Sequence, residues 1–215
     1  MKKLFKKYSP PSLYNCVKSI YYFCNAFWLR LVGRKPILAE SSKCYQRRLR
    51  EDFFHKYCNG RGLDIGYGGD LVFHTAQGWD FENGDAQYLK SLPDYGYDYV
   101  YSSHTLEHMI NPSIALSNWW RVLKKGGYLI IYIPDRDLYE KKKTLPSNWN
   151  LDHKFFFTLE KNEPPCTIGI NQLISEVLSD YVIIYSKVCS EGYISNGQSS
   201  HSSGEYSIEV VLEKI

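Results

Sequence analysis

The sequence predicts one α/β domain built on a mostly parallel sheet that helices cover. The chain has 215 residues, of which 44% are hydrophobic, enough for one sizeable core. Short apolar strands alternate with helical segments over residues 60–178, an order typical of parallel sheets. No membrane-spanning helix is expected, because Lys18 and Arg30 interrupt the most apolar stretch, residues 13–32.

The first 50 residues are predicted to form a basic extension. They hold 12 Lys and Arg and one acid, a formal charge of +11. Residues 1–12 are expected to be disordered, and 13–32 suit a helix whose largely aromatic surface must bury against the domain, a partner or lipid. Peripheral contact with an anionic surface such as the inner membrane and packing on the domain both remain open. We divide the chain into a basic, aromatic, helical extension (1–45) and a main domain (46–215).

The elements of the main domain follow from apolar runs and turn signals. A helix over 43–57 ends at the stop signal Cys58-Asn59-Gly60. Further helices are predicted at 114–123 and 170–178. Strands are expected at 62–65, up to Trp79, at 97–101, at 128–133, at 181–188 and at 206–212. The last two form a C-terminal antiparallel hairpin across a loop rich in Gly and Ser.

A glycine-rich turn, Gly66-Tyr67-Gly68-Gly69, follows the first predicted strand. Glycines let the backbone come close to a ligand, here at the carboxyl end of a strand, where open α/β sheets bind cofactors. A tight turn without a ligand is the alternative. No Gly-Lys-Ser/Thr follows, and Leu71 stands where the third glycine of the dinucleotide fingerprint would be. The turn therefore matches neither a Walker A loop nor that fingerprint.

Further motifs follow this turn in a fixed order: Gly78-Trp79-Asp80, Gly84-Asp85-Ala86, Ser102 to His108 (SSHTLEH) and Trp120 to Gly127 (WRVLKKGG). The succession, over roughly residues 50–160, resembles the class I S-adenosylmethionine-dependent methyltransferases of the type-11 group. Leu138-Tyr139-Glu140 and the later Asp152-His153-Lys154 extend the resemblance to members from bacterial capsule and lipopolysaccharide gene clusters. It implies a Rossmann-like sheet with helices on both faces, extra N-terminal helices, and S-adenosylmethionine as cofactor. It also implies a cytoplasmic enzyme that O-methylates a sugar or glycan precursor.

The resemblance also implies roles for individual residues in cofactor binding. These are Asp64, Gly66, Tyr67 and Gly68 for the methionine part, Asp80 for the ribose, Asp85 and Ala86 for the adenine edge, and Ser103 and His104 for the methyl group. Only four residues separate Asp80 from Asp85, whereas the family has room there for a helix and a strand. Either this unit is deleted, which trims the sheet near its second and third strands, or Asp80 is not the ribose ligand.

A hydroxyl acceptor must lose its proton during methyl transfer, so a base is expected near the acceptor. His153, beside Asp152, is the first candidate and His104 the second. Asp135 follows the strand at 128–133 and is a candidate for bonding a sugar or phosphate. A surface or packing role is the alternative for each. No metal site is predicted, because His104 and His108, four residues apart, lack further ligands.

Two other functions remain open: N-methylation of a small amine, which needs no base beyond neutralising that amine, and a non-catalytic, cofactor-binding subunit of a membrane enzyme. Nucleic acid is not an expected partner, because the net positive charge lies in the N-terminal fifth of the chain while the region expected to be catalytic is acidic. The six cysteines form no CxxC pair and no export signal is recognised, so buried, reduced thiols in the cytosol are expected.

Overall fold

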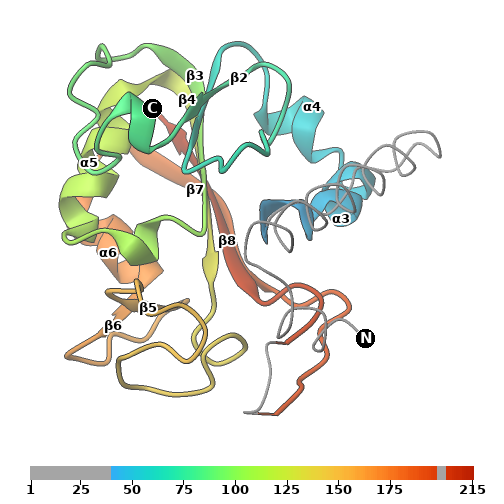
Figure 1. Ribbon diagram of the computed structural model, residues 1–215. Helices are drawn as coiled ribbons and strands as arrows, with labels where there is room; N and C mark the ends of the chain where they lie inside the picture. Colours follow the sequence, from blue (N-terminus) through green and yellow to red (C-terminus); the bar gives the residue numbers. More distant parts are fainter. Residues whose placement is uncertain (1–39, 198–201) are drawn as a thin grey trace, which may run out of the picture.

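The centre of the computed structural model is a six-stranded sheet with the order β2-β1-β3-β4-β8-β7 (Figure 1). The structure describes residues 40–197 and 202–215, so the helix predicted over 13–32 lies outside the described residues. Four strands are parallel: β1 (Gly62–Ile65), β2 (Ala76–Trp79), β3 (Tyr97–Ser103) and β4 (Leu123–Pro134). β7 (Tyr181–Cys189) and β8 (Ser207–Lys214) are antiparallel. The predicted sheet and its C-terminal hairpin are confirmed.

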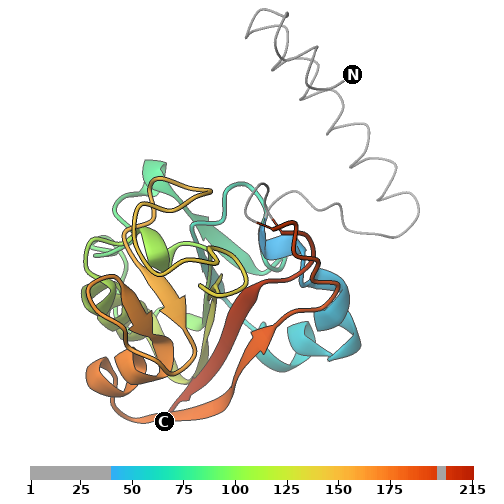
Figure 2. The same cartoon turned by 90° about the horizontal axis from the view of Figure 1, so that it is seen from below.

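Helices cover both faces of this sheet, as the family resemblance implies (Figures 1 and 2). α5 (Pro112–Val122) and α6 (Ile170–Val177) lie on one face; α3 (Tyr45–Arg50) and α4 (Phe53–Tyr57) lie on the other. Successive side chains of a strand point to opposite faces. Leu129 and Ile131 of β4 accordingly join the core under α5 and α6, while Ile130 and Tyr132 join the core under α3 and α4.

The edge of the sheet at β2 explains the short spacing between Asp80 and Asp85. Among the described residues no strand lies outside β2, and only the short 3-10 helix η2 (Phe81–Asn83) stands between the two acids. The alternative of a deleted unit, and with it a trimmed sheet, is therefore the one observed. Two further 3-10 helices, η1 (Glu40–Ser42) and η3 (Leu106–His108), and a small parallel sheet of β5 (Phe156–Thr158) and β6 (Thr167–Gly169) complete the fold.

The continuous helix predicted over 43–57 is wrong, because the chain breaks into α3 and α4 at Asp52, where φ is 55°. The buried residues of the two helices are Arg47, Arg48, Phe53 and Phe54. At about 100° per residue these four positions would spread around all sides of one continuous helix. The break lets both helices turn these side chains toward the sheet.

No described helix has the length and apolar character needed to cross a membrane. The four cysteines within the described ranges are all buried, as the sequence predicts: Cys44, Cys58, Cys166 and Cys189.

Candidate functional site

A cleft opens at the edge of the sheet where β1, β2 and β3 end. Its volume is about 680 Å³, within the range of roughly 300–1,000 Å³ that is typical of small-ligand sites. The residues predicted from sequence that line it are Gly66, Asp80, Asp85, Ala86 and His104. The carboxyl ends of the parallel strands thus bring together motifs that are up to 38 residues apart in the sequence.

The glycine turn after β1 contributes Gly66 to the lining of the cleft. Gly66 has a φ of +71°, and its N–H donates to the carbonyl of Trp79 at 2.8 Å. A Cβ on Gly66 would lie 2.1 Å from Oγ1 of Thr105, so only glycine fits. Gly68 and Gly69 also have positive φ, but a Cβ on either would meet nothing within 4 Å. The space next to the backbone is therefore filled at Gly66 and open at Gly68 and Gly69.

Asp80 joins the ends of β1 and β2 at the rim of the cleft. Its Oδ2 accepts from the N–H of Gly68 at 3.1 Å, and its Oδ1 accepts from the N–H of Phe81 at 2.9 Å. A carboxylate offers about four lone-pair sites, so Asp80 keeps capacity for a ligand. The neighbouring Phe81 lines the cleft with its side chain 95% exposed. Phe81 was not predicted from the sequence, although its position directly after the acid was a usable signal.

Asp85 and Ala86 form the adjoining wall of the cleft. The Oδ1 of Asp85 accepts from the N–H of Gln87 at 2.8 Å, which fixes the turn. The carbonyl of Ala86 accepts from Nε1 of Trp119 at 2.8 Å and thereby ties this wall to α5.

Four predicted cofactor residues do not line the cleft: Asp64, Tyr67, Gly68 and Ser103. Asp64 is buried and accepts from the N–H of Val72 at 2.6 Å. The ring of Tyr67 lies against Gly78, where a Cβ would meet it at 2.7 Å. The hydroxyl oxygen of Ser103 is buried and has no hydrogen-bond partner among the described residues.

Histidines and carboxyl groups gather at the end of the cleft next to β3. His104, His108 and Asp152 line it, and Glu107 and His153 lie buried behind them. Burial lowers the pKa of His104 to about 3, so its imidazole is neutral at physiological pH. Burial also raises the pKa of Glu107 to about 7. This end of the cleft therefore holds the neutral imidazole of His104 beside a poorly solvated carboxyl group.

The first candidate for the base, His153, makes its main contact with Glu140 rather than with Asp152. Its Nδ1 lies 2.9 Å from Oε1 of Glu140, and both side chains are almost fully buried. Asp152 instead pairs with Nδ1 of His108 at 3.0 Å. The sequence did carry a signal for the first pair, because Leu138-Tyr139-Glu140 and Asp152-His153-Lys154 belong to the same resemblance.

Asp135 lies outside the lining of the cleft. Its Oδ1 accepts from the N–H groups of Asp137 and Leu138, both at 3.0 Å, and so caps the turn after β4. Burial raises its pKa. In this structure Asp135 stabilises a turn and does not face the space between the strand ends.

Comparison with known proteins relates part of this chain to methyltransferases. Residues 56–131 match a family model described as a methyltransferase domain. A curated probable S-adenosylmethionine-dependent methyltransferase of Mycolicibacterium smegmatis is 24% identical over 147 residues. That match covers 56% of this chain and 57% of the relative, so the chain spans little more than half of the relative's length. The first finding relates this part of the chain to methyltransferases, and the second to one that is described as dependent on S-adenosylmethionine.

Two solved structures that align with this chain illustrate the comparison. One, from work on the conversion of a disulfide bond into a thioacetal group during echinomycin biosynthesis, aligns with a TM-score of 0.54 and 12% identity. The alignment covers 80% of this chain and 81% of that one. A SAM-dependent methyltransferase from Archaeoglobus fulgidus aligns with a TM-score of 0.45 and 18% identity, over 79% and 94% of the two chains. At this identity the first likeness shows a common fold and nothing about the substrate.

Proposed function

We propose that the chain is an S-adenosylmethionine-dependent methyltransferase that acts on a hydroxyl group of a small molecule. The observation that carries the proposal is the cleft beside the glycine turn, bordered by the carboxylates of Asp80 and Asp85. We further propose that the acceptor is a sugar or a glycan precursor of capsule or lipopolysaccharide synthesis. This part is supported by the motifs Leu138-Tyr139-Glu140 and Asp152-His153-Lys154.

The chemistry of the cleft suits an adenosyl cofactor. Carboxylates accept hydrogen bonds from ribose hydroxyls and from the adenine amino group. In the proposed arrangement Asp80 holds the ribose, Asp85 faces the adenine edge, and the exposed ring of Phe81 covers the base. The open space above Gly68 and Gly69 admits the remaining part of the cofactor. When bound, S-adenosylmethionine supplies a methyl carbon already activated by its sulfonium leaving group.

The opposite end of the cleft supports a hydroxyl acceptor. The protein must orient the acceptor and exclude water, and a hydroxyl must also lose its proton as the bond forms. His104, His108 and Asp152 line this end and can hydrogen-bond the acceptor. An amine acceptor would need only to be neutral, so a cluster of this kind favours oxygen over nitrogen as the methylated atom.

Calorimetry with S-adenosylhomocysteine tests the cofactor site. The intact chain is expected to bind it one to one, and Asp80→Asn to weaken binding. Loss of charge-assisted hydrogen bonds costs about 1.5–3 kcal/mol, which is roughly 10- to 100-fold in affinity. Asp94→Asn is the matched control, because Asp94 is exposed and pairs with Arg121 away from the cleft. Absence of binding by the intact chain, or equal loss in both variants, contradicts the proposal.

The acceptor class needs a separate assay. Labelled S-adenosylmethionine is incubated with a panel of nucleotide sugars and glycan precursors and, in parallel, with a panel of small amines. Mass detection identifies the methylated product. We expect O-methylated sugar products. Products from amines alone contradict the hydroxyl part of the proposal and leave the cofactor part standing.

A further inference from the structure

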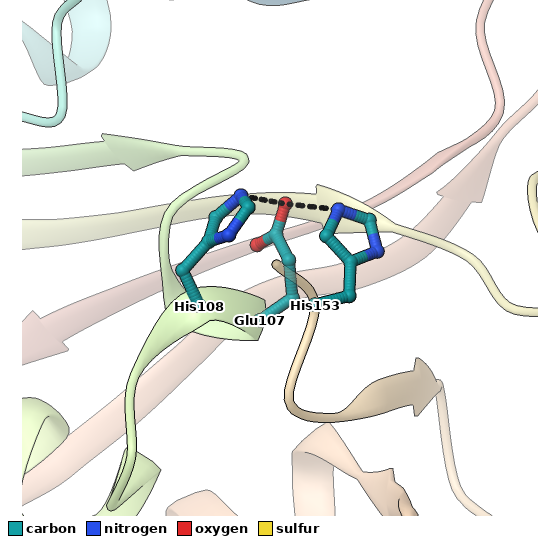
Figure 3. A group of neighbouring side chains, drawn as sticks. All are labelled: Glu107, His108 and His153. Carbon is teal, nitrogen blue, oxygen red and sulfur yellow. Dashed lines mark ion pairs between the residues drawn. The ribbon is translucent and has the colours of Figure 1, made fainter. Parts of the chain in front are cut away.

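Three potential metal ligands meet at the end of the cleft next to β3: Glu107, His108 and His153 (Figure 3). The first two belong to η3, and His153 comes from the loop before β5. The Nε2 atoms of both histidines point toward Oε1 of Glu107, each at 3.9 Å. One ligand atom from each residue lies within 4.8 Å of the others. Residues from two separate segments thus direct lone pairs toward one point.

The far side of each imidazole is held by a carboxylate. Nδ1 of His108 lies 3.0 Å from Oδ2 of Asp152, and Nδ1 of His153 lies 2.9 Å from Oε1 of Glu140. Glu140 also accepts from Oγ of Ser147 at 2.6 Å. A carboxylate that accepts the Nδ1 proton leaves the Nε2 lone pair free, and metal-binding histidines are oriented in this way. Both histidines therefore carry the outer contact that metal ligands have.

Glu107 has no such contact. Its side chain is fully buried, and neither carboxyl oxygen has a hydrogen-bond partner among the described residues. A buried carboxylate without a partner costs several kcal/mol, so a group of this kind is normally paired or bound to a metal. Three imidazole nitrogens lie 3.9 Å from its Oε1: Nδ1 of His104, Nε2 of His108 and Nε2 of His153. A cation at the centre of the cluster would satisfy Glu107.

We propose that Glu107, His108 and His153 bind a divalent first-row transition ion of the Zn²⁺ type. Imidazole and carboxylate ligands suit such an ion, whereas Ca²⁺ and Mg²⁺ prefer all-oxygen sites. With metal–ligand distances of about 2.1 Å, ligands in a tetrahedral site lie about 3.4 Å apart. The two histidine–Glu107 pairs, at 3.9 Å, must therefore close by about half an ångström, and the two histidine nitrogens, which lie within 4.8 Å of each other, by at most about 1.4 Å. No metal site was predicted from the sequence, because His104 and His108 alone lack further ligands and His153 follows 45 residues after His108.

The position of the cluster suggests a use for the ion. Its ligand His108 and the outer residue Asp152 line the cleft, so the ion borders the acceptor space. Three protein ligands leave a fourth position open. An acceptor hydroxyl bound there would have its pKa lowered and would release its proton to water in the cleft. The oxygen's electron pair then forms a bond with the methyl carbon. At the same time the carbon–sulfur bond breaks, and sulfur keeps the two electrons of that broken bond. This use rests on the proposed function; the metal site itself does not.

Metal binding is tested on the full chain, prepared without a histidine tag and dialysed against a chelator. Titration with Zn²⁺ followed by calorimetry is expected to give one tight site, and Mg²⁺ none. Glu107→Gln and His153→Ala are expected to weaken binding at least tenfold. The outer variant Glu140→Gln should weaken it roughly 10- to 100-fold. The matched control is His55→Ala, because His55 has an exposed side chain and lies outside the cleft.

A spectroscopic measurement on the unaltered chain covers the case in which variants do not fold. Co²⁺ bound by this cluster should give the strong visible absorption bands of an ion with a low coordination number. Adding Zn²⁺ should displace the Co²⁺ and abolish these bands. Only the weak spectrum of hydrated Co²⁺, or equal Zn²⁺ affinity of Glu107→Gln and the intact chain, overturns the site. S-Adenosylhomocysteine binding without metal binding refutes this inference alone. Metal binding without S-adenosylhomocysteine binding refutes the proposed function alone.

Discussion

Gly66 is the residue at which the backbone of the cleft has the least freedom. A left-handed conformation costs a non-glycine residue about 1–2 kcal/mol. Contact of the new Cβ with Thr105 adds a packing penalty of about 1–3 kcal/mol. We expect Gly66→Ala to lower the free energy of unfolding by about 2–5 kcal/mol, measured by chemical denaturation.

Gly68→Ala provides the matched control, because Gly68 has a φ of +56° but open space above it. Gly68→Ala should lower the free energy of unfolding only by the conformational cost of about 1–2 kcal/mol. In a double-mutant cycle, Thr105→Ala should restore part of the stability of Gly66→Ala, since the two residues are in contact. Equal losses at Gly66 and Gly68 would mean that the collision with Thr105 contributes nothing.

The sequence predicted those cleft residues whose position depends only on the course of the backbone. Gly66, Asp80 and Asp85 follow strands or turns that can be read from the sequence, and they line the cleft. Tyr67 does not line it, because the missing side chain of Gly78 on the neighbouring strand leaves room for its ring. The partner of His153 could not be read from adjacency either. Such side-chain directions depend on contacts between distant segments.

At the scale of elements, the strands were the easiest part to predict. Apolar runs bounded by Gly and Pro gave β1, β3, β4, β7 and β8 to within a few residues at most ends. β5 and β6 were missed, since three residues carry too little periodicity to indicate a strand. The break between α3 and α4 was missed because it allows α3 to contact β8, and β8 comes about 160 residues later in the sequence.

Those contacts attach α3 to the sheet through a buried ion-pair network. Arg47 and Arg48 both contact the carboxylate of Glu209, at 2.9 and 2.7 Å. Removing one partner from a buried pair leaves an uncompensated charge, which costs about 3–5 kcal/mol. We expect this loss in the free energy of unfolding for Glu209→Gln. In contrast, Glu191→Gln disrupts the exposed pair with Arg50 and should cost less than about 1 kcal/mol.

The same network predicts how stability depends on pH. Burial alone would raise the pKa of Glu209, but Arg48 and Arg47 outweigh it and lower the pKa from 4.5 to about 2. A carboxyl group with a lowered folded-state pKa stabilises the fold fully above its unfolded value and loses that contribution as pH falls. Stability should therefore decline between about pH 4.5 and pH 2 in the intact chain. Glu209→Gln should show a shallower decline, and an unchanged slope would contradict this assignment.

At the scale of the whole molecule, the described fold reduces the basic charge that is free to meet a surface. The sequence assigns 12 basic residues to positions 1–50. Lys43, Arg47, Arg48 and Arg50 pair with acids of the fold. Eight Lys and Arg and no acid remain within residues 1–39. Any electrostatic attraction to an anionic membrane should therefore depend on residues 1–39.

Flotation with vesicles tests this dependence. Each Lys near an anionic surface contributes about 1 kcal/mol, so four Lys→Gln substitutions at Lys2, Lys3, Lys6 and Lys7 should reduce partitioning by roughly two to three orders of magnitude. The effect should weaken as salt is raised, because salt screens the attraction. A control with exposed Lys90, Lys125 and Lys161 changed to Gln removes charge elsewhere and should float like the intact chain. Equal flotation of the N-terminal variant and the intact chain would show that this charge does not bring the chain to a membrane.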